Sequence, residues 1–144
     1  MIDMSPEIPG RLWAKVDSSG DCWEWTGAKK QGFGYGLAWF DGKLRRAHRV
    51  FYEVLVGPIP PGRDLDHLCR NQSCVNPAHL EPVSHRENVL RGAGPSARNA
   101  AKTHCKHGHP FDAANTLIRS NGHRACRTCK RANNRRWKAK AANG

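Results

Sequence analysis

The sequence has no uninterrupted apolar run of the ~18–20 residues that a membrane-spanning helix needs. Hydrophobic residues make up only 38% of the 144 residues, so any core must be small. The N-terminus lacks a basic stretch followed by an apolar stretch, the pattern of a secretory signal. We therefore expect a cytoplasmic protein, and in that compartment six cysteines indicate metal ligands rather than disulfides.

Acidic residues are nearly missing from the C-terminal part of the chain. Residues 89–144 contain 13 Lys and Arg but only Asp112 as an acid, whereas residues 1–88 contain 11 basic and 11 acidic residues. The whole excess of +12 therefore lies in the C-terminal part. A neutral body with a strongly basic tail indicates a polyanionic partner, and nucleic acid fits best because the tail lacks the pattern of a lipid-binding helix. The alternative is a solvated, partly disordered tail.

Turn-forming residues divide the neutral part into short elements. The pair Asp41-Gly42 predicts a two-residue hairpin between strands at 34–40 and 43–47. Apolar spacing then predicts a helix over 48–56.

A second strand–loop–strand–helix segment follows a Pro-rich loop. Residues 64–67 and 80–83 are predicted as strands on either side of a cysteine-rich loop. Ser84 is placed to cap a helix over 85–91, with Glu87 at the third helical position.

Three side chains of this segment meet the needs of phosphodiester hydrolysis, which requires an activated water and a charge sink for the phosphate. His67 can act as a general base near neutral pH, and the oxygens of Asp66 and Asn88 suit a hard cation such as Mg²⁺. Asp66 and His67 are neighbours in an extended segment, so their side chains point to opposite sides. An isolated Asp-His pair would more simply be a polar surface pair.

Cysteine spacing predicts a zinc site in the loop between the two strands. Cys69, Cys74 and His79 follow one another at intervals of five residues. Thiolate and imidazole ligands suit Zn²⁺ rather than Mg²⁺, and a closed structural site needs four of them. Cys22 is the remaining upstream cysteine and completes the predicted set. The alternative to a zinc site is that these cysteines are free and buried and that His79 is a surface residue.

The basic tail contains a second group of candidate zinc ligands. A Cys-x2-Cys pair at 126 and 129 follows Cys105 and two histidines, which is typical of a zinc ribbon. The predicted ligands are Cys105, His109, Cys126 and Cys129, with His107 as the alternative to His109. The segment that follows is rich in helix formers and predicts phosphate contacts by Lys130, Arg131, Arg135, Arg136 and Lys138.

The motifs Asp66-His67, Asn76-Pro77, His79-Leu80 and Glu87-Asn88 together resemble the HNH, or His-Me finger, endonucleases of phages and mobile introns. The loop Cys-x4-Cys-x-Asn-Pro-x-His-Leu also resembles the zinc loop of His-Cys box homing endonucleases. The resemblance implies an α+β fold, in which a zinc-stabilised ββα-metal core follows a β-hairpin and a helix. The domains expected are an N-terminal extension (1–20), a nuclease domain (21–92), a linker (93–102) and a zinc-ribbon-like, DNA-binding tail (103–144).

The resemblance also implies roles for individual residues. His67 would be the general base, and Asp66 and Asn88 would hold one Mg²⁺, Mn²⁺ or similar ion. Asn76 is the nearest match to the asparagine that orients the base, and His79 stands where the family often has asparagine. Arg46, His48 and Arg49 would contact DNA.

We therefore predict a metal-dependent endonuclease that cuts double-stranded DNA in a bacterial or phage-infected cell and leaves 5′-phosphate and 3′-hydroxyl ends. It would contain one catalytic divalent cation and two structural Zn²⁺ ions, and a homodimer would allow both strands to be cut. The alternative is a non-catalytic zinc-stabilised DNA-binding protein. A binding protein has no use for a base beside a metal-binding carboxylate, so Asp66, His67 and Asn88 favour the enzyme.

Overall fold

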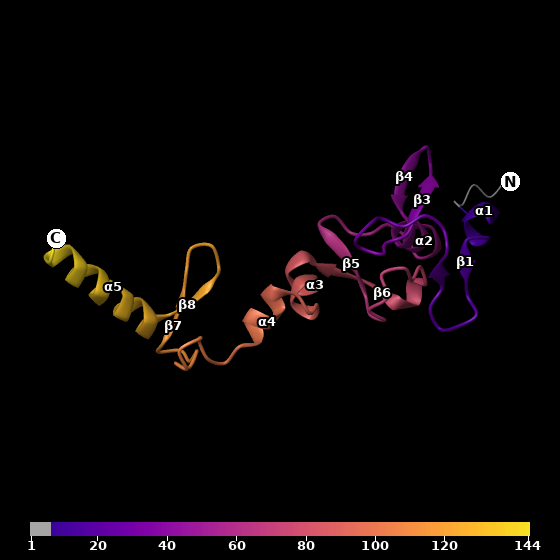
Figure 1. Cartoon of the computed structure of the whole chain (residues 1–144). Helices are drawn as coiled ribbons and strands as arrows, with labels where there is room; N and C mark the ends of the chain where they lie inside the picture. Colours follow the sequence, from indigo (N-terminus) through magenta and orange to yellow (C-terminus); the bar gives the residue numbers. More distant parts are fainter. Residues whose placement is uncertain (1–6) are drawn as a thin grey trace. The chain divides into compact units, whose positions relative to one another are not determined.

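The structure, a computed structural model, describes residues 7–144, and the chain divides into two compact units at Arg91 and Gly92 (Figure 1). Residues 1–6, the start of the expected N-terminal extension, lie outside the described residues. Every sheet in the described part is a two-stranded antiparallel pair. Both units combine such pairs with helices, so the fold is a small mixed α and β fold.

Trp25 is the centre of the core of the first unit. Its side chain is fully buried, and its ring meets that of Phe51 edge to face with centroids 6.3 Å apart. The indole N–H donates a hydrogen bond to the carbonyl of Ala28 at 3.0 Å. Trp25 belongs to β2 (Glu24–Trp25), which pairs with β1 (Val16–Asp17).

The described residues of the expected N-terminal extension contribute side chains to this core. Helix α1 (Gly10–Trp13) buries Leu12, and Ile8 is buried in the same cluster. Sequence patterning missed this contribution because α1 has only four residues, too few to show a helical period.

The predicted hairpin and the helix after it are confirmed. Strands β3 (Leu37–Phe40) and β4 (Lys43–Arg46) pair with Phe40 opposite Lys43, which leaves a two-residue turn. Asp41 and Gly42 both have positive φ angles, 51° and 70°, as this type of turn requires. Helix α2 (Ala47–Leu55) begins directly after the hairpin.

The second predicted segment, strand–loop–strand–helix, is also confirmed. Strand β5 (Arg63–His67) pairs with β6 (Leu80–Ser84), and a short 3₁₀ helix, η1 (Pro77–His79), ends the loop between them. Helix α3 (His85–Arg91) packs against both strands. Its first turn is capped by the Ser84 hydroxyl, which accepts a hydrogen bond from the Glu87 N–H at 3.2 Å.

The second unit differs from the sequence expectation in its first part. The expected linker, 93–102, contains helix α4 (Pro95–Ala101), because Pro95 suits the first helical position and alanines follow it. Strands β7 (Thr116–Ile118) and β8 (Arg124–Cys126) form a hairpin that leads into α5 (Arg127–Ala142). None of the described helices is long and apolar enough to cross a membrane.

Replacement of Gly36 by alanine is expected to destabilise the first unit. A Cβ atom at this position would lie 2.6 Å from Cδ1 of Trp25 and 3.1 Å from the Cβ of Ala47. Overpacking of this kind costs about 1–3 kcal/mol, which thermal or denaturant unfolding would detect. Gly20→Ala is the matched control, because its Cβ would meet no atom within 4 Å. Equal stability of the two variants would contradict the prediction.

Candidate functional site

Strand β5 separates the candidate metal-binding carboxylates from the candidate base. Asp64 and Asp66 contact side chains of α3, whereas His67 turns to the other side and contacts Cys74. Asp66 and His67 therefore point to opposite sides of the strand, as the extended segment predicted. Both are buried, with 3% and 6% of their surfaces exposed.

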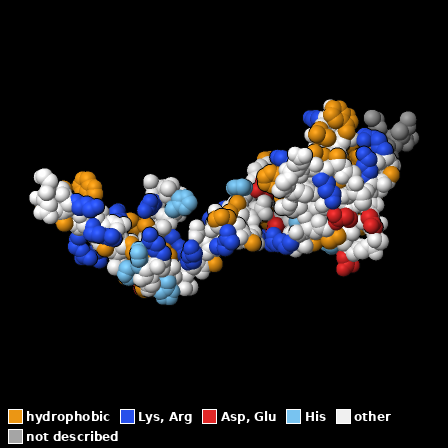
Figure 2. Space-filling model, viewed as in Figure 1, with side chains coloured by type: hydrophobic (Ala, Val, Ile, Leu, Met, Phe, Trp, Pro, Cys, Tyr) orange, Lys and Arg blue, Asp and Glu red, His pale blue; other side chains and the backbone are white. Residues whose placement is uncertain are grey.

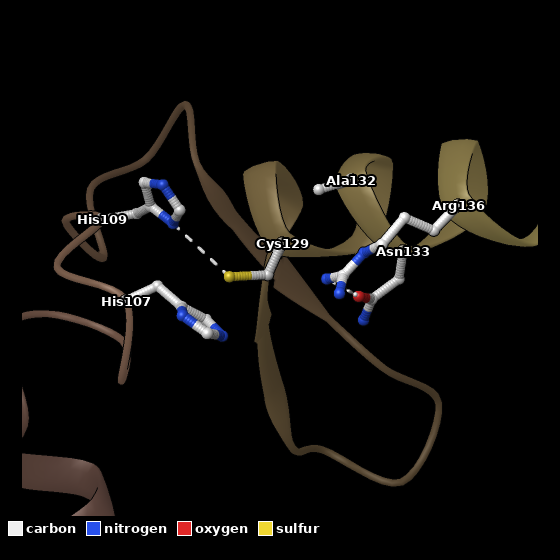
Figure 3. A pocket seen from close by; sticks show the side chains of 6 residues that line it. All are labelled: His107, His109, Cys129, Ala132, Asn133 and Arg136. Atoms are coloured by element: carbon white, nitrogen blue, oxygen red, sulfur yellow. Dashed lines mark hydrogen bonds between the residues drawn. The ribbon is translucent and has the colours of Figure 1, made fainter.

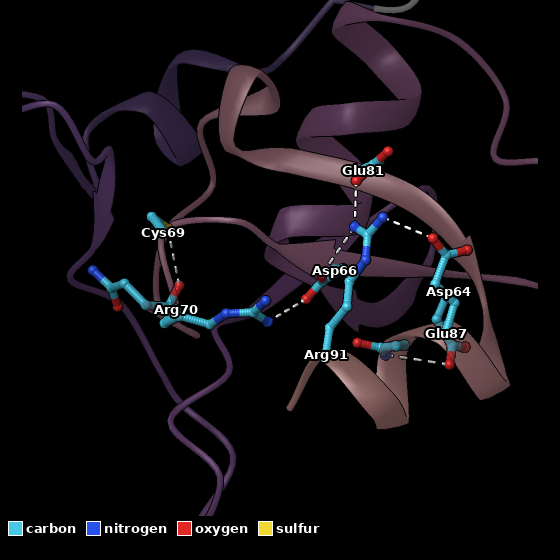
Figure 4. Close-up of polar contacts among 9 residues, drawn as sticks. Asp64, Asp66, Cys69, Arg70, Glu81, Glu87 and Arg91 are labelled. Atoms are coloured by element: carbon cyan, nitrogen blue, oxygen red, sulfur yellow. Dashed lines mark hydrogen bonds and ion pairs between the residues drawn. The ribbon is translucent and has the colours of Figure 1, made fainter. Parts of the chain in front are cut away.

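The carboxylate of Asp66 is held by two arginines. Its Oδ1 lies 2.8 Å from Nη1 of Arg70, and its Oδ2 lies 3.4 Å from Nη1 of Arg91. Figure 4 shows Arg91 among three acids, since it also pairs with Glu81 and, at 2.7 Å, with Glu87. A cation bound by Asp66 would therefore have to share the carboxylate with these guanidinium groups.

Asn88 contacts a carboxylate that the sequence analysis did not select. Its Nδ2 lies 3.4 Å from Oδ2 of Asp64, and Nδ1 of His85 lies 2.8 Å from the same oxygen. The hydrogen bond to His85 is the main cause that lowers the pKa of Asp64. Among the described residues no hydrogen bond joins Asn88 to Asp66. Strand alternation could have found Asp64, because residues two apart lie on one side.

His67 is held in one tautomer by the zinc-ligand loop. Its Nε2 lies 3.1 Å from the backbone carbonyl oxygen of Cys74, which can only accept a hydrogen bond. In the neutral ring Nε2 therefore carries the proton, and Nδ1 carries the free lone pair. Burial lowers the pKa of His67 below its usual value, so the ring is neutral near pH 7. A neutral, oriented imidazole with a free Nδ1 can accept a proton.

Asn76 does not orient this histidine, contrary to the role that the resemblance implied. Its Oδ1 accepts from the N–H of Ala78 at 3.0 Å, and its Nδ2 donates to the carbonyl of Asp21 at 3.1 Å. The side chain thus caps η1 and ties the loop to the segment before β2. The carbonyl of Cys74 orients His67 instead.

Two further aromatic side chains surround His67. The ring centroid of His48, in the first turn of α2, lies 4.7 Å from that of His67, and the ring of Tyr35 lies 5.8 Å away. His48, for which a DNA contact was predicted, is buried, with 6% of its surface exposed. Arg46 lies over the ring of Tyr35 at 4.6 Å and Arg49 is partly exposed, so both arginines stay candidates for DNA contact.

The four predicted ligands of the first zinc site come together although Cys22 is distant in sequence. The backbone of Trp23 and Trp25 pairs with the loop, through hydrogen bonds of 2.9 Å to Val75 and Ser73. This pairing delivers Cys22 to the loop. The ligand atoms of the group all lie within 4.8 Å of one another, and its members are Cys22, Cys69, Cys74 and His79.

Distances within this group fit a tetrahedral zinc ion. Nδ1 of His79 lies 3.6 Å from the sulfur of Cys22 and 3.6 Å from that of Cys74. A tetrahedron with Zn–S of about 2.3 Å and Zn–N of about 2.0 Å has edges of about 3.5–3.8 Å. Burial raises the pKa of the Cys74 thiol to about 12, so its thiolate needs the positive charge that a bound ion supplies.

The second predicted group comes together in the same way, and His109 rather than His107 belongs to it. Nδ1 of His109 lies 3.4 Å from the sulfurs of Cys105 and Cys129 and 3.7 Å from that of Cys126. His107 instead lines a neighbouring pocket, together with His109, Cys129, Ala132, Asn133 and Arg136 (Figure 3). Both groups could therefore hold zinc.

Helix α5 presents the basic residues of the tail to solvent. Figure 2 shows Lys and Arg side chains over the second unit and acidic side chains only on the first, on the face in view. Trp137, in the same helix, is 75% exposed. The exposed basic residues of α5 include Lys130, Arg131, Arg135, Arg136 and Lys138.

Comparisons with known proteins find one matching family model and relatives from phages. A family model described as HNH endonuclease matches residues 45–90. The chain is 43% identical to Protein 7.7 of Escherichia phage T7 over 68 residues. This aligned segment covers 47% of this chain and 52% of Protein 7.7. It is 42% identical to Protein 2.8 of the same phage over 76 residues. This second aligned segment covers 51% of this chain and 50% of Protein 2.8. The chain thus spans about half the length of these relatives. No solved structure gives a significant match.

Purified protein is expected to contain two zinc ions per chain, one for each Cys/His group. Cys74→Ser and Cys126→Ser should each remove one ion, because each loses one thiolate ligand. Elemental analysis of the purified protein and of both variants would measure this. Ser73→Ala, which changes a neighbouring residue outside the group, is the control for the first site. Zinc content near zero in folded wild-type protein would contradict both sites.

Proposed function

We propose that the protein is a divalent-metal-dependent endonuclease acting on double-stranded DNA, because residues 45–90 match the family model described as HNH endonuclease. The observation that carries the proposal is the state of His67: the ring is buried and neutral, its Nε2 is fixed by the carbonyl of Cys74, and its Nδ1 has no hydrogen bond within residues 7–144. A residue that only binds DNA has no need of this arrangement.

His67 would start the reaction by accepting a proton from water at Nδ1. The water oxygen forms a bond to phosphorus while the bond from phosphorus to the 3′ oxygen breaks. The 3′ oxygen then takes up a proton from solvent. The products are a 5′-phosphate and a 3′-hydroxyl end.

Asp66 and Asn88 would hold the divalent cation, because carboxylate and amide oxygens suit Mg²⁺ and Mn²⁺. The Oδ1 of Asn88 accepts no hydrogen bond from the described residues, and Asp64 offers a further carboxylate beside it. When bound, such an ion neutralises charge on the phosphate and on the leaving oxygen. Arg70 and Arg91 meanwhile pair with the buried Asp66 carboxylate and offset its charge.

The basic helix α5 would supply affinity for DNA through phosphate contacts that do not depend on sequence. Its exposed Lys and Arg side chains and the exposed Trp137 support this role. Affinity and chemistry would thus come from different units of the chain.

His67→Ala is expected to reduce DNA cleavage at least 100-fold, because a general base typically contributes about 10²–10⁴-fold. The assay is nicking of supercoiled plasmid with Mg²⁺ or Mn²⁺, followed by mapping of the ends. His123→Ala, in the exposed turn before β8, is the matched control and should cleave as wild type does. The enzyme hypothesis fails if the wild type cleaves none of a varied set of DNA substrates with any divalent metal.

Replacing the five basic residues of α5 by glutamine should weaken DNA binding and reduce its salt dependence. Each lost phosphate contact lowers the slope of log K against log salt by about 0.9, so the slope should fall by up to about 4.5. Glutamine preserves helix propensity. The control exchanges Lys and Arg at the same positions, which preserves charge. The replaced residues are Lys130, Arg131, Arg135, Arg136 and Lys138. An unchanged slope in the glutamine variant would show that α5 does not bind phosphates.

A further inference from the structure

We propose that Trp137 is a base-stacking residue, through which helix α5 binds single-stranded DNA. The inference rests on the proposed role of α5 in DNA binding, which assigns it phosphate contacts, and adds the form of DNA that this helix prefers. Its starting point is the exposure of one aromatic ring. Trp137 is 75% exposed, more than any other large hydrophobic side chain within residues 7–144.

The ring of Trp137 stands alone on its face of the helix. Residues three and four positions apart are neighbours on a helix surface, and for Trp137 these are Asn133, Asn134, Lys140 and Ala141. No residue of α5 is buried. A helix that docks in a protein groove or on a lipid surface needs a stripe of large apolar side chains at such intervals, and this face has none. A protein groove or a membrane therefore does not match the exposed indole.

The charge around the ring selects a polyanion. Residues 113–144 contain no Asp or Glu, whereas Arg136 and Lys138 flank Trp137 in sequence. None of the ion pairs in the described part of the chain involves α5. Nucleic acid combines negative phosphates with flat aromatic bases, so it matches both the cations and the ring.

Stacking requires a base whose face the ring can reach. In a duplex the neighbouring base pairs cover each base, whereas the bases of a single strand can splay out onto aromatic side chains. Trp137 lies eight residues after Cys129, the last ligand of the second Cys/His group, which is about 12 Å along the helix axis. Figure 1 shows the end of α5 extending away from the β7–β8 hairpin. Lys140, one turn further on, is placed to contact the phosphate of the stacked nucleotide.

The test measures binding of a labelled oligothymidylate and of a labelled duplex to the full chain, without added divalent metal so that neither is cut. Trp137→Ala should bind the single strand about 5- to 100-fold more weakly, because stacking on one base supplies a factor of this size. Its affinity for the duplex should change less than about twofold, and the salt slope should not change, because no phosphate contact is lost. Alanine preserves the helix.

Two further variants separate stacking from other effects. Trp137→Phe keeps an aromatic ring and should bind the single strand within about fivefold of the wild type. Binding of unlabelled oligothymidylate should quench the tryptophan emission of the wild type and much less that of Trp137→Phe. Trp39→Ala removes another exposed indole, from β3 in the first unit, and should bind the single strand as the wild type does. The zinc content of each variant reports the integrity of the second unit.

The inference is overturned if the wild type does not bind the single strand, or if Trp137→Ala binds it equally well. An equal loss of affinity for the duplex would also overturn it, as would a Trp137-dependent affinity for vesicles of anionic phospholipid in place of the single strand. A wild type that binds single strands through Trp137 but cuts no DNA would overturn the proposed nuclease function and leave this inference standing.

Discussion

The hydrogen bond between Nε2 of His67 and the carbonyl of Cys74 is the interaction on which the arrangement of the site depends. It fixes the tautomer of the candidate base, and it does so from a residue whose thiol belongs to the first Cys/His group. A zinc ion bound there would hold the Cys74 backbone in place and, through it, the histidine ring. The backbone pairing that brings Cys22 to the loop extends this restraint to the core around Trp25. A structural metal would thus orient a side chain that it does not itself touch.

Asp66 and His67 are neighbours in strand β5, but their side chains lie in different electrostatic environments. The buried Asp66 carboxylate pairs with Arg70 and Arg91 on its side of the strand. The aromatic rings of Tyr35 and His48 surround His67 on the other side. Burial lowers the pKa of His67 whereas the Asp66 carboxylate raises it, so a carboxylate on the same side of the strand would favour the protonated ring. The alternation of an extended strand keeps the two environments separate.

Local patterns in the sequence predicted most elements that carry the site, because each has a short-range cause. The Asp41-Gly42 turn, the Ser84 cap and the ligand spacing of the two Cys/His groups are examples. Contacts between distant segments were less accessible. Asn76 matches a family motif, but its amide is used by Ala78 and Asp21, and no local pattern reveals this. His48 lies between two arginines and looks exposed in sequence, yet the fold buries it against His67.

The two Cys/His groups would serve different purposes, because the units that contain them differ in their cores. The first unit buries Trp25, Val50 and Phe51 and has an apolar centre without any metal. In the described part of the second unit, Cys126 is the one buried side chain, so that unit has almost no hydrophobic core. A small segment of this kind depends on a metal for most of its folding free energy. Zinc would therefore act as the core of the second unit, whereas in the first unit it would set the geometry of an already stable site.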